Sequence, residues 1–563
     1  MTSASRTARD ESPLPRVFTR PISRPGLITG VLFFVVSLLP SMLPRSSITQ
    51  GVVSGIAFMI GYALGAAWQW AWNFLELPRP KGRVWRIVVV VWYVALAVLV
   101  VSGMWRFVGW QNDVRDLFGM DRISAAVWLT VIPVTIAVAA LILIVARSLR
   151  KLFHLITRWL GRHLRRRQAL LLGGVVLALL LWGVWSGILV NGFFAGANQI
   201  FAPRDTATDE GVVQPESANR SGSPESVGSW ESLGRKGRTF VATGPTVEEL
   251  NAYHGGDAVE PIRVYAGLKS ARTPAARAEL VLEELKRTGA FEREVLVVAT
   301  TTGTGFLEPN AVDSLEYVHN GNTAIAGVQY SYLPSWISLL ADQDEVKETS
   351  QVVFDTIHGY WSTLPENSRP EIYVYGLSLG SFGVESILTS IDIVNEPIDG
   401  ALLVGPPFVN NMWNQLVDGR DEGSSPPTPI YEQGRTVRFT NEENALSLPT
   451  GEWGDTKVLY LQHASDPVVF FSPELLLGEP DWLLEGQRGS DLTDDFVWIP
   501  FVTMFQVLID LPAAGSVPEG FGHLYTRQAN ADAWIAITEP DGWTETDTKD
   551  LKEHLSQLPT DPE

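Results

Sequence analysis

The chain has 563 residues, too long for one ordinary domain, so two or more parts are expected. It contains no cysteine, which excludes disulfides, thiolate catalysis and cysteine-ligated metals. The net charge of −19 is unevenly spread: residues 1–196 hold 21 Lys and Arg against 6 Asp and Glu (net +15), and residues 197–563 hold 22 against 56 (net −34). This asymmetry indicates a membrane region followed by an acidic soluble region, and it argues against a nucleic-acid partner.

Five apolar stretches in the first 200 residues are each long enough to cross a bilayer as a helix of about 20 residues. None contains an acidic residue or a histidine, and none is followed by the cleavage pattern of a secretory signal. We therefore expect a basic tail (1–25) and a transmembrane domain (26–196) whose partner is the lipid bilayer, with no ion path. The predicted spans are residues 26–43, 51–74, 87–104, 123–146 and 170–194.

The basic residues predict the orientation of this domain. They gather in the N-terminal tail and in the second and fourth connections, and such loops stay in the cytoplasm. The first connection has only Arg45, and the third balances its arginines with aspartates. Five spans then place the N-terminus in the cytoplasm and everything after residue 196 outside the cell membrane. A sixth span, or a re-entrant first span ending near Pro40 and Pro44, would reverse this orientation.

Small residues in the second predicted span indicate close helix contacts. Glycines recur there at a spacing of four, which places them on nearly one helix face. The spacing favours packing within the chain, and it leaves open a homo-oligomer through the transmembrane helices. The glycines are Gly51, Gly55, Gly61 and Gly65.

The remaining sequence changes character twice. Residues 197–236 are rich in Pro, Ser, Gly, Glu and Asp and predict a flexible linker. Residues 237–545 alternate strand-like and helix-like segments, which predicts a mostly parallel sheet with helices on both faces, and 546–563 form a polar tail. The predicted strands are 262–268, 294–300, 323–329, 372–375, 401–404 and 458–462, and the main predicted helices are 274–287, 309–318 and 345–362.

The central motif is Gly376-Leu-Ser-Leu-Gly380, which follows a short strand and precedes a helix. A serine hydroxyl becomes an effective nucleophile when it is held on a tight turn beside a base, and glycines two residues either side allow that turn. The motif predicts Ser378 as a nucleophile. The alternative is a helix N-cap serine after a glycine-rich turn.

A serine nucleophile needs a histidine base and an acid that orients it. His523 lies in the glycine-flanked loop Gly520-Phe-Gly-His-Leu-Tyr525 and is the predicted base, with His463 as its main competitor; His358, inside a predicted helix, is taken as structural. Asp466, just after a predicted strand, is the predicted acid, with a turn or helix-cap role as its alternative. The scattered histidines predict no metal site, and no cofactor is expected.

The oxyanion of an acyl transfer needs two backbone N–H donors. We expect one from Leu379, directly after the serine. The other should come from the loop Thr300-Thr-Thr-Gly-Thr-Gly305, with Thr301 and Thr302 as equal candidates. That loop is not followed by the Lys-Ser/Thr of a phosphate-binding turn, so a nucleotide is not expected.

Four motifs together resemble the bacterial membrane-bound α/β-hydrolase family, which joins a multi-span N-terminal region to a serine-hydrolase domain. They are Pro40-Ser-Met-Leu-Pro-Arg45, Ser223-Pro-Glu-Ser-Val-Gly-Ser-Trp-Glu-Ser-Leu-Gly-Arg235, Gly376-Leu-Ser-Leu-Gly380 and His463-Ala-Ser-Asp-Pro467. The resemblance implies a helical membrane domain followed by an α/β-hydrolase domain with hydrolase chemistry at Ser378. It implies no particular substrate.

Two insertions suggest a cap over the serine, formed by residues 406–434 and by the apolar segment 498–511. The predicted substrate is an ester of a lipid or other envelope component, and segment 498–511 as a plain core helix is the alternative. Acyl transfer by the same triad, or an inactive membrane-anchored scaffold, are the competing functions. The residues expected to contact substrate are Tyr332, Met412, Trp413, Phe501 and Phe505.

Overall fold

The computed structural model describes residues 22–78, 82–183, 196, 201–334, 337–338, 343–390, 393 and 396–559. They form two compact units. The helical unit comprises residues 1–40, 45–113 and 121–193, and the α/β unit comprises residues 41–44, 114–120 and 194–563. The predicted linker (197–236) therefore belongs to the second unit, as do two short segments from within the predicted membrane region.

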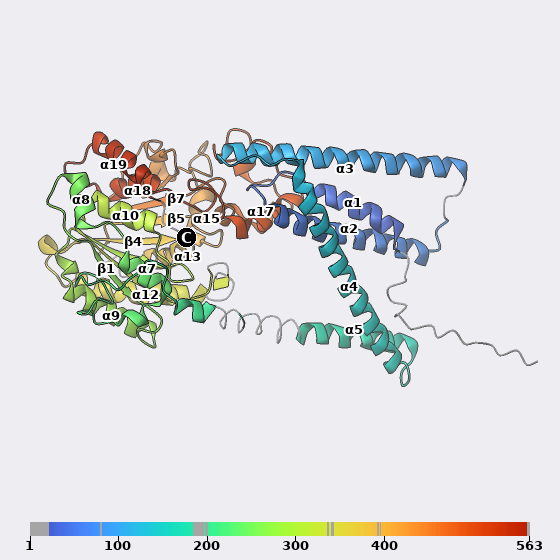
Figure 1. The fold of residues 1–563 in the computed structure, drawn as a ribbon, viewed down its shortest axis with the longest axis horizontal. Helices are drawn as coiled ribbons and strands as arrows, with labels where there is room; N and C mark the ends of the chain where they lie inside the picture. Colours follow the sequence, from blue (N-terminus) through green and yellow to red (C-terminus); the bar gives the residue numbers. More distant parts are fainter. Residues whose placement is uncertain are drawn as a thin grey trace, which may run out of the picture. The chain divides into compact units, whose positions relative to one another are not determined.

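Each predicted span overlaps a helix of the helical unit (Figure 1), although the last part of the fifth predicted span, residues 184–194, lies outside the described residues. Among the described residues, four helices are long and apolar enough to cross a membrane: Ser47–Phe74, Arg83–Leu117, Ala125–Leu160 and Arg166–Gly183. The first expected span, 26–43, is helical only to Val36, so its 13-residue helix is about 20 Å long. The helices are α1 (Arg24–Val36), α2 (Ser47–Phe74), α3 (Arg83–Leu117), α4 (Trp128–Leu160) and α5 (Arg166–Gly183).

The glycines of α2 allow its neighbours to approach closely. A Cβ added to Gly61 or Gly65 would collide with the backbone of α1, and one added to Gly51 or Gly55 would lie within 2.7 Å of a valine side chain of α4. The hydroxyl of Thr29 in α1 donates to the carbonyl of Gly61 at 2.6 Å. Both glycine pairs are therefore used in packing within the chain.

The α/β unit is built on one seven-stranded parallel sheet with the order β1-β3-β2-β4-β5-β7-β6. The strand residues are apolar almost without interruption because helices bury both faces of the sheet. Six of the strands were expected from sequence, and the fourth extends to Leu377. The strands are β1 (Ile262–Ala266), β2 (Val295–Thr300), β3 (Thr323–Val328), β4 (Glu371–Leu377), β5 (Gly400–Val404), β6 (Val437–Thr440) and β7 (Lys457–Leu461).

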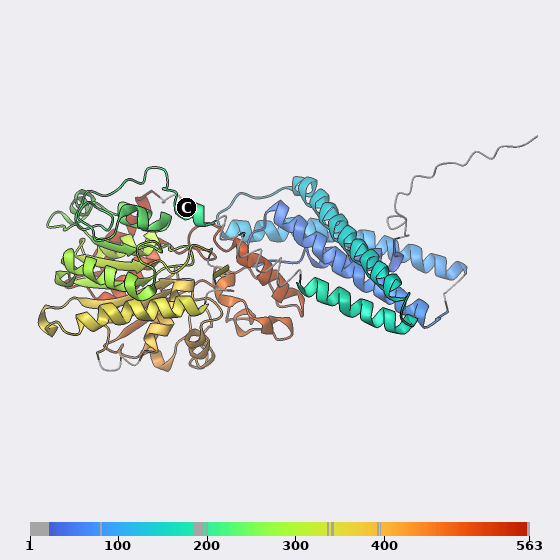
Figure 2. The ribbon, with the colours of Figure 1, turned by 90° about the horizontal axis from the view of Figure 1, so that it is seen from below.

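Two apolar clusters lie on the two faces of this sheet, and the ribbon shows helices on either side of the strands (Figure 1 and Figure 2). Alternate residues of each strand point to opposite faces: Leu296 and Val298 of β2 join the first cluster, whereas Val295 and Val297 join the second. The first cluster includes residues of α9 (Pro274–Arg287), α12 (Gln343–Trp361), α13 (Leu379–Leu388), α15 (Asn411–Asp418), α16 (Pro467–Phe470) and α17 (Val502–Asp510), and the second includes residues of α7 (Gly234–Ala242), α10 (Pro309–Val318) and α18 (Arg527–Thr538).

The expected flexible linker is instead packed against the sheet edge. Arg220 forms a parallel bridge with Arg263 of β1, and the N–H of Ser221 donates to the carbonyl of Arg263 at 3.1 Å. Ser221 is buried, and Leu233 lies in the core. The polar composition misled the prediction because these residues satisfy their hydrogen bonds against β1 instead of in water.

The expected polar tail is also structured. Residues Glu545–Gln557 form helix α19, which begins at a capping box of Thr544 and Asp547. Leu551 and Leu555 are buried against Leu250, which lies in helix α8 (Val247–His254). Only two of the 13 residues of α19 are apolar, so the helical periodicity was too sparse to predict this helix from the sequence.

We predict that Leu551→Ala lowers the free energy of unfolding by about 2–5 kcal/mol, because it leaves a cavity under α19. The thermal unfolding midpoint of the full chain in lipid nanodiscs, followed by tryptophan fluorescence, measures the loss. Glu553→Ala on the exposed side of the same helix is the matched control and should change little. Equal midpoints for the two variants would show that α19 does not stabilise the unit.

Candidate functional site

Ser378 lies in the turn between β4 and α13, in a backbone conformation that L-residues rarely adopt. Its φ is 54° and its ψ is −124°, a strain of roughly 1–3 kcal/mol. A Cβ on Gly376 would collide with the backbone of Gly380, and a Cβ on Gly380 would collide with the carbonyl oxygen of Thr300. Both positions therefore require glycine. The turn is the sharp strand-to-helix elbow that presents a nucleophile at the edge of a sheet.

The neighbouring strand brings the loop of His523 to this turn. The N–H of Ser378 donates to the carbonyl of Val404, the last residue of β5, at 2.9 Å. The next residue, Gly405, has a φ of +52°, and a Cβ there would lie 2.6 Å from Cε1 of His523. The imidazole of His523 therefore packs against Gly405, the residue that follows the strand paired with the turn of Ser378.

Asp466 holds the imidazole of His523. Nδ1 of His523 lies 2.6 Å from Oδ2 of Asp466, a carboxylate that is fully buried. An ionised carboxylate only accepts hydrogen bonds, so Nδ1 carries a proton, and in the neutral ring the lone pair is then on Nε2. Nε2 is buried and has no hydrogen-bond partner among the described residues. This is the tautomer that a general base acting on a serine hydroxyl requires.

Two further donors fix the Asp466 carboxylate. The N–H of Val468 donates to Oδ1 at 2.8 Å, and the hydroxyl of Tyr525 donates to Oδ2 at 2.8 Å. Burial and the charge of Asp466 hold the pKa of Tyr525 well above its usual value, so its hydroxyl keeps the proton that it donates. Asp466 thus also caps α16, the alternative role considered for it, and it does so together with the contact to His523.

His463, the competing base, is committed elsewhere. Its Nδ1 lies 2.9 Å from the carbonyl of Gly522, and its Nε2 lies 3.0 Å from Oε1 of Glu442. Both partners are acceptors, so both ring nitrogens donate and His463 is an imidazolium. Burial lowers the pKa of His463, but the hydrogen bond and charge of Glu442 outweigh it and the net pKa is raised. His358 is also occupied, because its Nε2 contacts the carbonyl of Glu396.

The ion pair of His463 and Glu442 supports the loop that carries His523. Glu442 also accepts hydrogen bonds from the N–H and the hydroxyl of Thr526. The ring of His463 stacks on Tyr525 with centroids 4.1 Å apart. The two residues of the ion pair therefore contact the loop at residues 522, 525 and 526, on both sides of His523. Glu442 and Tyr525 were not singled out from sequence, although Tyr525 stands only two residues after the predicted base.

The two candidate donors for an oxyanion differ in the structure. The N–H of Thr302 donates to the carbonyl of Phe306 at 2.9 Å and is used within its own loop. Thr301 is buried directly after β2, beside β4, and its hydroxyl donates to the carbonyl of Val328. Leu379 is the first residue of α13, where backbone N–H groups have no partner within the helix.

A partly buried carboxyl group follows the same loop. The pKa of Glu308 is raised to about 7, chiefly by burial and also by the charge of Glu519, while the N–H of Asn310 and the charge of His523 act to lower it. The N–H of Asn310 donates to this carboxyl group at the start of α10. Glu308 therefore changes charge in the pH range of an ordinary histidine, near the imidazole of His523.

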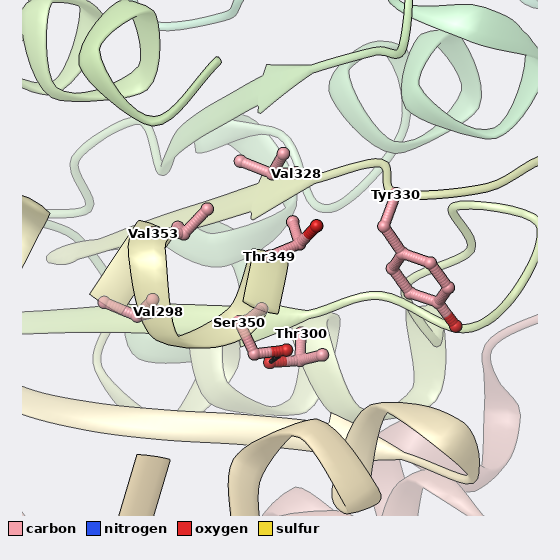
Figure 3. Close-up of a pocket in the computed structure, with 8 residues that line it drawn as sticks. Val298, Thr300, Val328, Tyr330, Thr349, Ser350 and Val353 are labelled. Atoms are coloured by element: carbon pink, nitrogen blue, oxygen red, sulfur yellow. Dashed lines mark hydrogen bonds between the residues drawn. The ribbon is translucent and has the colours of Figure 1, made fainter. Parts of the chain in front are cut away.

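A small cavity lies between β2, β3 and α12 (Figure 3). It offers about 10 Å³ to the centre of a water molecule, which is room for one water and for no organic substrate. The hydroxyls of Thr300 and Ser350 hydrogen-bond each other at 3.3 Å beside it. The cavity sits behind the turn of Ser378 and is not a substrate site.

The residues expected to bind substrate are not gathered in one place. Trp413 is a correction: it is buried, and its indole N–H donates to Gln462 at 2.6 Å, so it belongs to the core. Met412 is partly buried against the same core, and Tyr332 packs on a separate small cluster with Leu333. Phe501 and Phe505 are exposed, at the start and in the middle of α17.

We predict that Glu442→Gln removes the charge partner of His463 and lowers the free energy of unfolding by about 3 kcal/mol near pH 6. The raised pKa of His463 gives stability that is full below its unfolded pKa of about 6.5 and is lost as the pH rises through its folded pKa. The net lowered pKa of Glu442 gives stability that is full above about 4.5 and is lost as the pH falls through its folded pKa.

Thermal midpoints between pH 4 and 9 measure this effect. In Glu442→Gln, the thermal midpoint should lose the part of its pH dependence that comes from the pair of His463 and Glu442. Glu294→Gln, which removes the partner of His319 away from the site, is the control and should keep it. An unchanged midpoint for Glu442→Gln near pH 6 would mean that His463 is neutral.

Comparison with known protein families identifies the family of the chain. Residues 262–551 match the model of the alpha/beta-hydrolase family, and residues 38–245 match the model of the N-terminus of an alpha/beta-hydrolase family. No curated protein and no solved structure matches the chain. The first match covers more than half of the chain and includes Ser378, Asp466 and His523. The chain therefore belongs to the alpha/beta-hydrolase family, a family of hydrolase-type enzymes.

Proposed function

We propose that the chain is a membrane-anchored serine hydrolase that cleaves carboxylic esters through Ser378, His523 and Asp466. The observation that carries the proposal is the imidazole of His523, which is tied to Asp466 through Nδ1 at 2.6 Å and keeps a buried, unpartnered Nε2 among the described residues. Further support comes from Gly405, which the ring of His523 contacts and which follows the strand paired with the strained turn of Ser378. His463, by contrast, uses both of its ring nitrogens in contacts with Gly522 and Glu442.

The reaction follows from these positions. Oγ of Ser378 attacks the ester carbonyl carbon while Nε2 of His523 takes the hydroxyl proton, and the carbonyl electrons move to its oxygen. The N–H groups of Leu379 and Thr301 stabilise that oxyanion, since the N–H of Thr302 is occupied. His523 then protonates the leaving alcohol as the C–O bond breaks. Water, deprotonated by His523, releases the acid from the acyl-enzyme.

The sidedness of the α/β unit follows from two short segments that belong to it. Residues 41–44 precede α2, and residues 114–120 lie at the end of α3 and just after it. The start of α2 and the end of α3 are therefore joined directly, along the chain, to segments that belong to the α/β unit. The opposite ends, around residues 75–86 and 147–167, carry the dense Lys and Arg that favour the cytoplasm. This supports an α/β unit outside the cell membrane, whether or not α1 crosses it.

The substrate class that we propose is an ester of a lipid or another envelope component. Support comes from α17, which exposes Phe501 and Phe505 and packs against α16. The side chain of Asp466 caps α16. Exposed aromatic side chains so close to the proposed acid favour an acyl chain over a polar substrate.

We predict that a membrane-impermeant fluorophosphonate labels the wild-type chain on intact cells and does not label Ser378→Ala. Ester hydrolysis should fall on the order of 10⁴-fold in the same variant. Ser386→Ala is the matched control, because Ser386 lies on α13 and is as buried as Ser378, at 8% exposure. It should keep both signals.

The two failures of this experiment are distinct. Labelling of lysed cells alone would overturn the sidedness and keep the chemistry. The absence of labelling in a folded sample, in intact and lysed cells alike, would overturn the hydrolase and favour an inactive scaffold.

A further inference from the structure

Helix α17 buries its three polar residues together with Val507 and exposes three large apolar side chains. Thr503, Gln506 and Asp510 are buried, at 2%, 4% and 1% exposure. Phe501, Phe505 and Leu508 are 57%, 49% and 41% exposed. A helix on a water-soluble surface shows the reverse distribution. The exposed side of α17 is therefore suited to an apolar surrounding.

The exposed residues form one continuous surface, which we call the apolar stripe: Phe501, Phe505 and Leu508. Their spacing of four and three residues places them on one face of the helix. Leu477, exposed at 68%, extends the stripe, because the N–H of Phe501 donates to the carbonyl of the preceding Leu476 at 2.8 Å. Contiguous exposed apolar surface of this kind marks an interaction site.

The other end of α17 is fixed close to the start of a membrane helix. Oδ2 of Asp510 accepts hydrogen bonds from the backbone N–H groups of Met42 and Leu43, at 3.0 and 3.3 Å. Ser47, where α2 begins, is only four positions after Leu43. Four residues span at most about 14 Å when fully extended. Asp510 of α17 thus binds the backbone of the short segment that leads directly into α2, an apolar helix long enough to cross the bilayer.

We propose that the apolar stripe of α17 lies in the bilayer leaflet on the side of the α/β unit, in contact with lipid acyl chains. The reversed polarity of the helix provides the apolar face, and the link from Asp510 to residues 42 and 43 sets its distance from the membrane. The bilayer is the favoured occupant because the chain itself brings it within reach of α17.

The proposed contact of the apolar stripe with the bilayer has a consequence for the candidate site of Ser378 and His523. This consequence rests on the proposed function. α17 packs against α16, the helix that Asp466 caps. The rim of Ser378 and His523 is then held at the membrane surface. A lipid ester reaches the serine by moving along the leaflet, without crossing water.

The absence of cysteine from the chain makes the contact directly measurable. Leu508→Cys in the full chain, labelled with an environment-sensitive fluorophore in lipid nanodiscs, reports on the stripe. Val259→Cys is the matched control, because Val259 has nearly the same exposure (40%). It precedes the amino end of β1, whereas Ser378 follows the carboxyl end of β4. Each label is exposed to a quencher attached to lipid acyl chains and to iodide in the water.

We expect the lipid-borne quencher to act several-fold more strongly on the label at 508 than on the label at 259, and iodide to show the reverse order. Strong quenching by iodide at both positions would overturn the proposal, since the stripe would then face water. Protection of position 508 from both quenchers would also overturn it, since protein would then cover the stripe. Fluorophosphonate labelling of Ser378 is scored separately, so a failed membrane contact is distinguishable from a failed hydrolase.

Discussion

The candidate site depends on the carboxylate of Asp466 being fully satisfied while it is buried. Three donors reach it: Nδ1 of His523, the hydroxyl of Tyr525 and the N–H of Val468. A buried carboxylate without such partners would be protonated or would destabilise the fold. The same contacts join β7, α16 and the loop of residues 520–526. The contacts that orient His523 therefore also hold these elements together at the carboxyl ends of the strands.

The sheet makes this arrangement possible because all of its strands are parallel. The turns after β4, β5 and β7 lie side by side at one edge, and they carry Ser378, Gly405 and Asp466. The strain at Ser378 persists because both flanking glycines are fitted into the backbone around them. The ion pair of His463 and Glu442 then supplies the histidine loop with rigidity that a loop of this composition lacks on its own.

Sequence patterns predicted the elements that local rules determine. The helices Pro274–Arg287 and Pro309–Val318 were predicted to the residue because each starts with proline and has a clear periodicity. The serine, acid and histidine of the candidate site were predicted from motif context and chain order.

The failures concern contacts between residues distant in sequence. The linker packs because Arg220 and Ser221 meet β1, and β6 was missed because it is a four-residue edge strand. Trp413 was predicted to contact substrate, but its indole N–H donates to Gln462, 49 residues away. The local sequence does not indicate that contact. The residues next to Glu442 in the sequence do not predict its contact with His463.

The α/β unit is completed by side chains from the region that carries the membrane helices. Met42, Leu43, Val114 and Phe118 are buried in its core, and the ring of Phe118 stacks on Phe521 at 4.2 Å, two residues before His523. A fragment beginning at residue 237, as composition alone would suggest, lacks all four of them. Such a fragment would lose the stacking partner of Phe521, so the loop that carries His523 would lack one of its packing contacts.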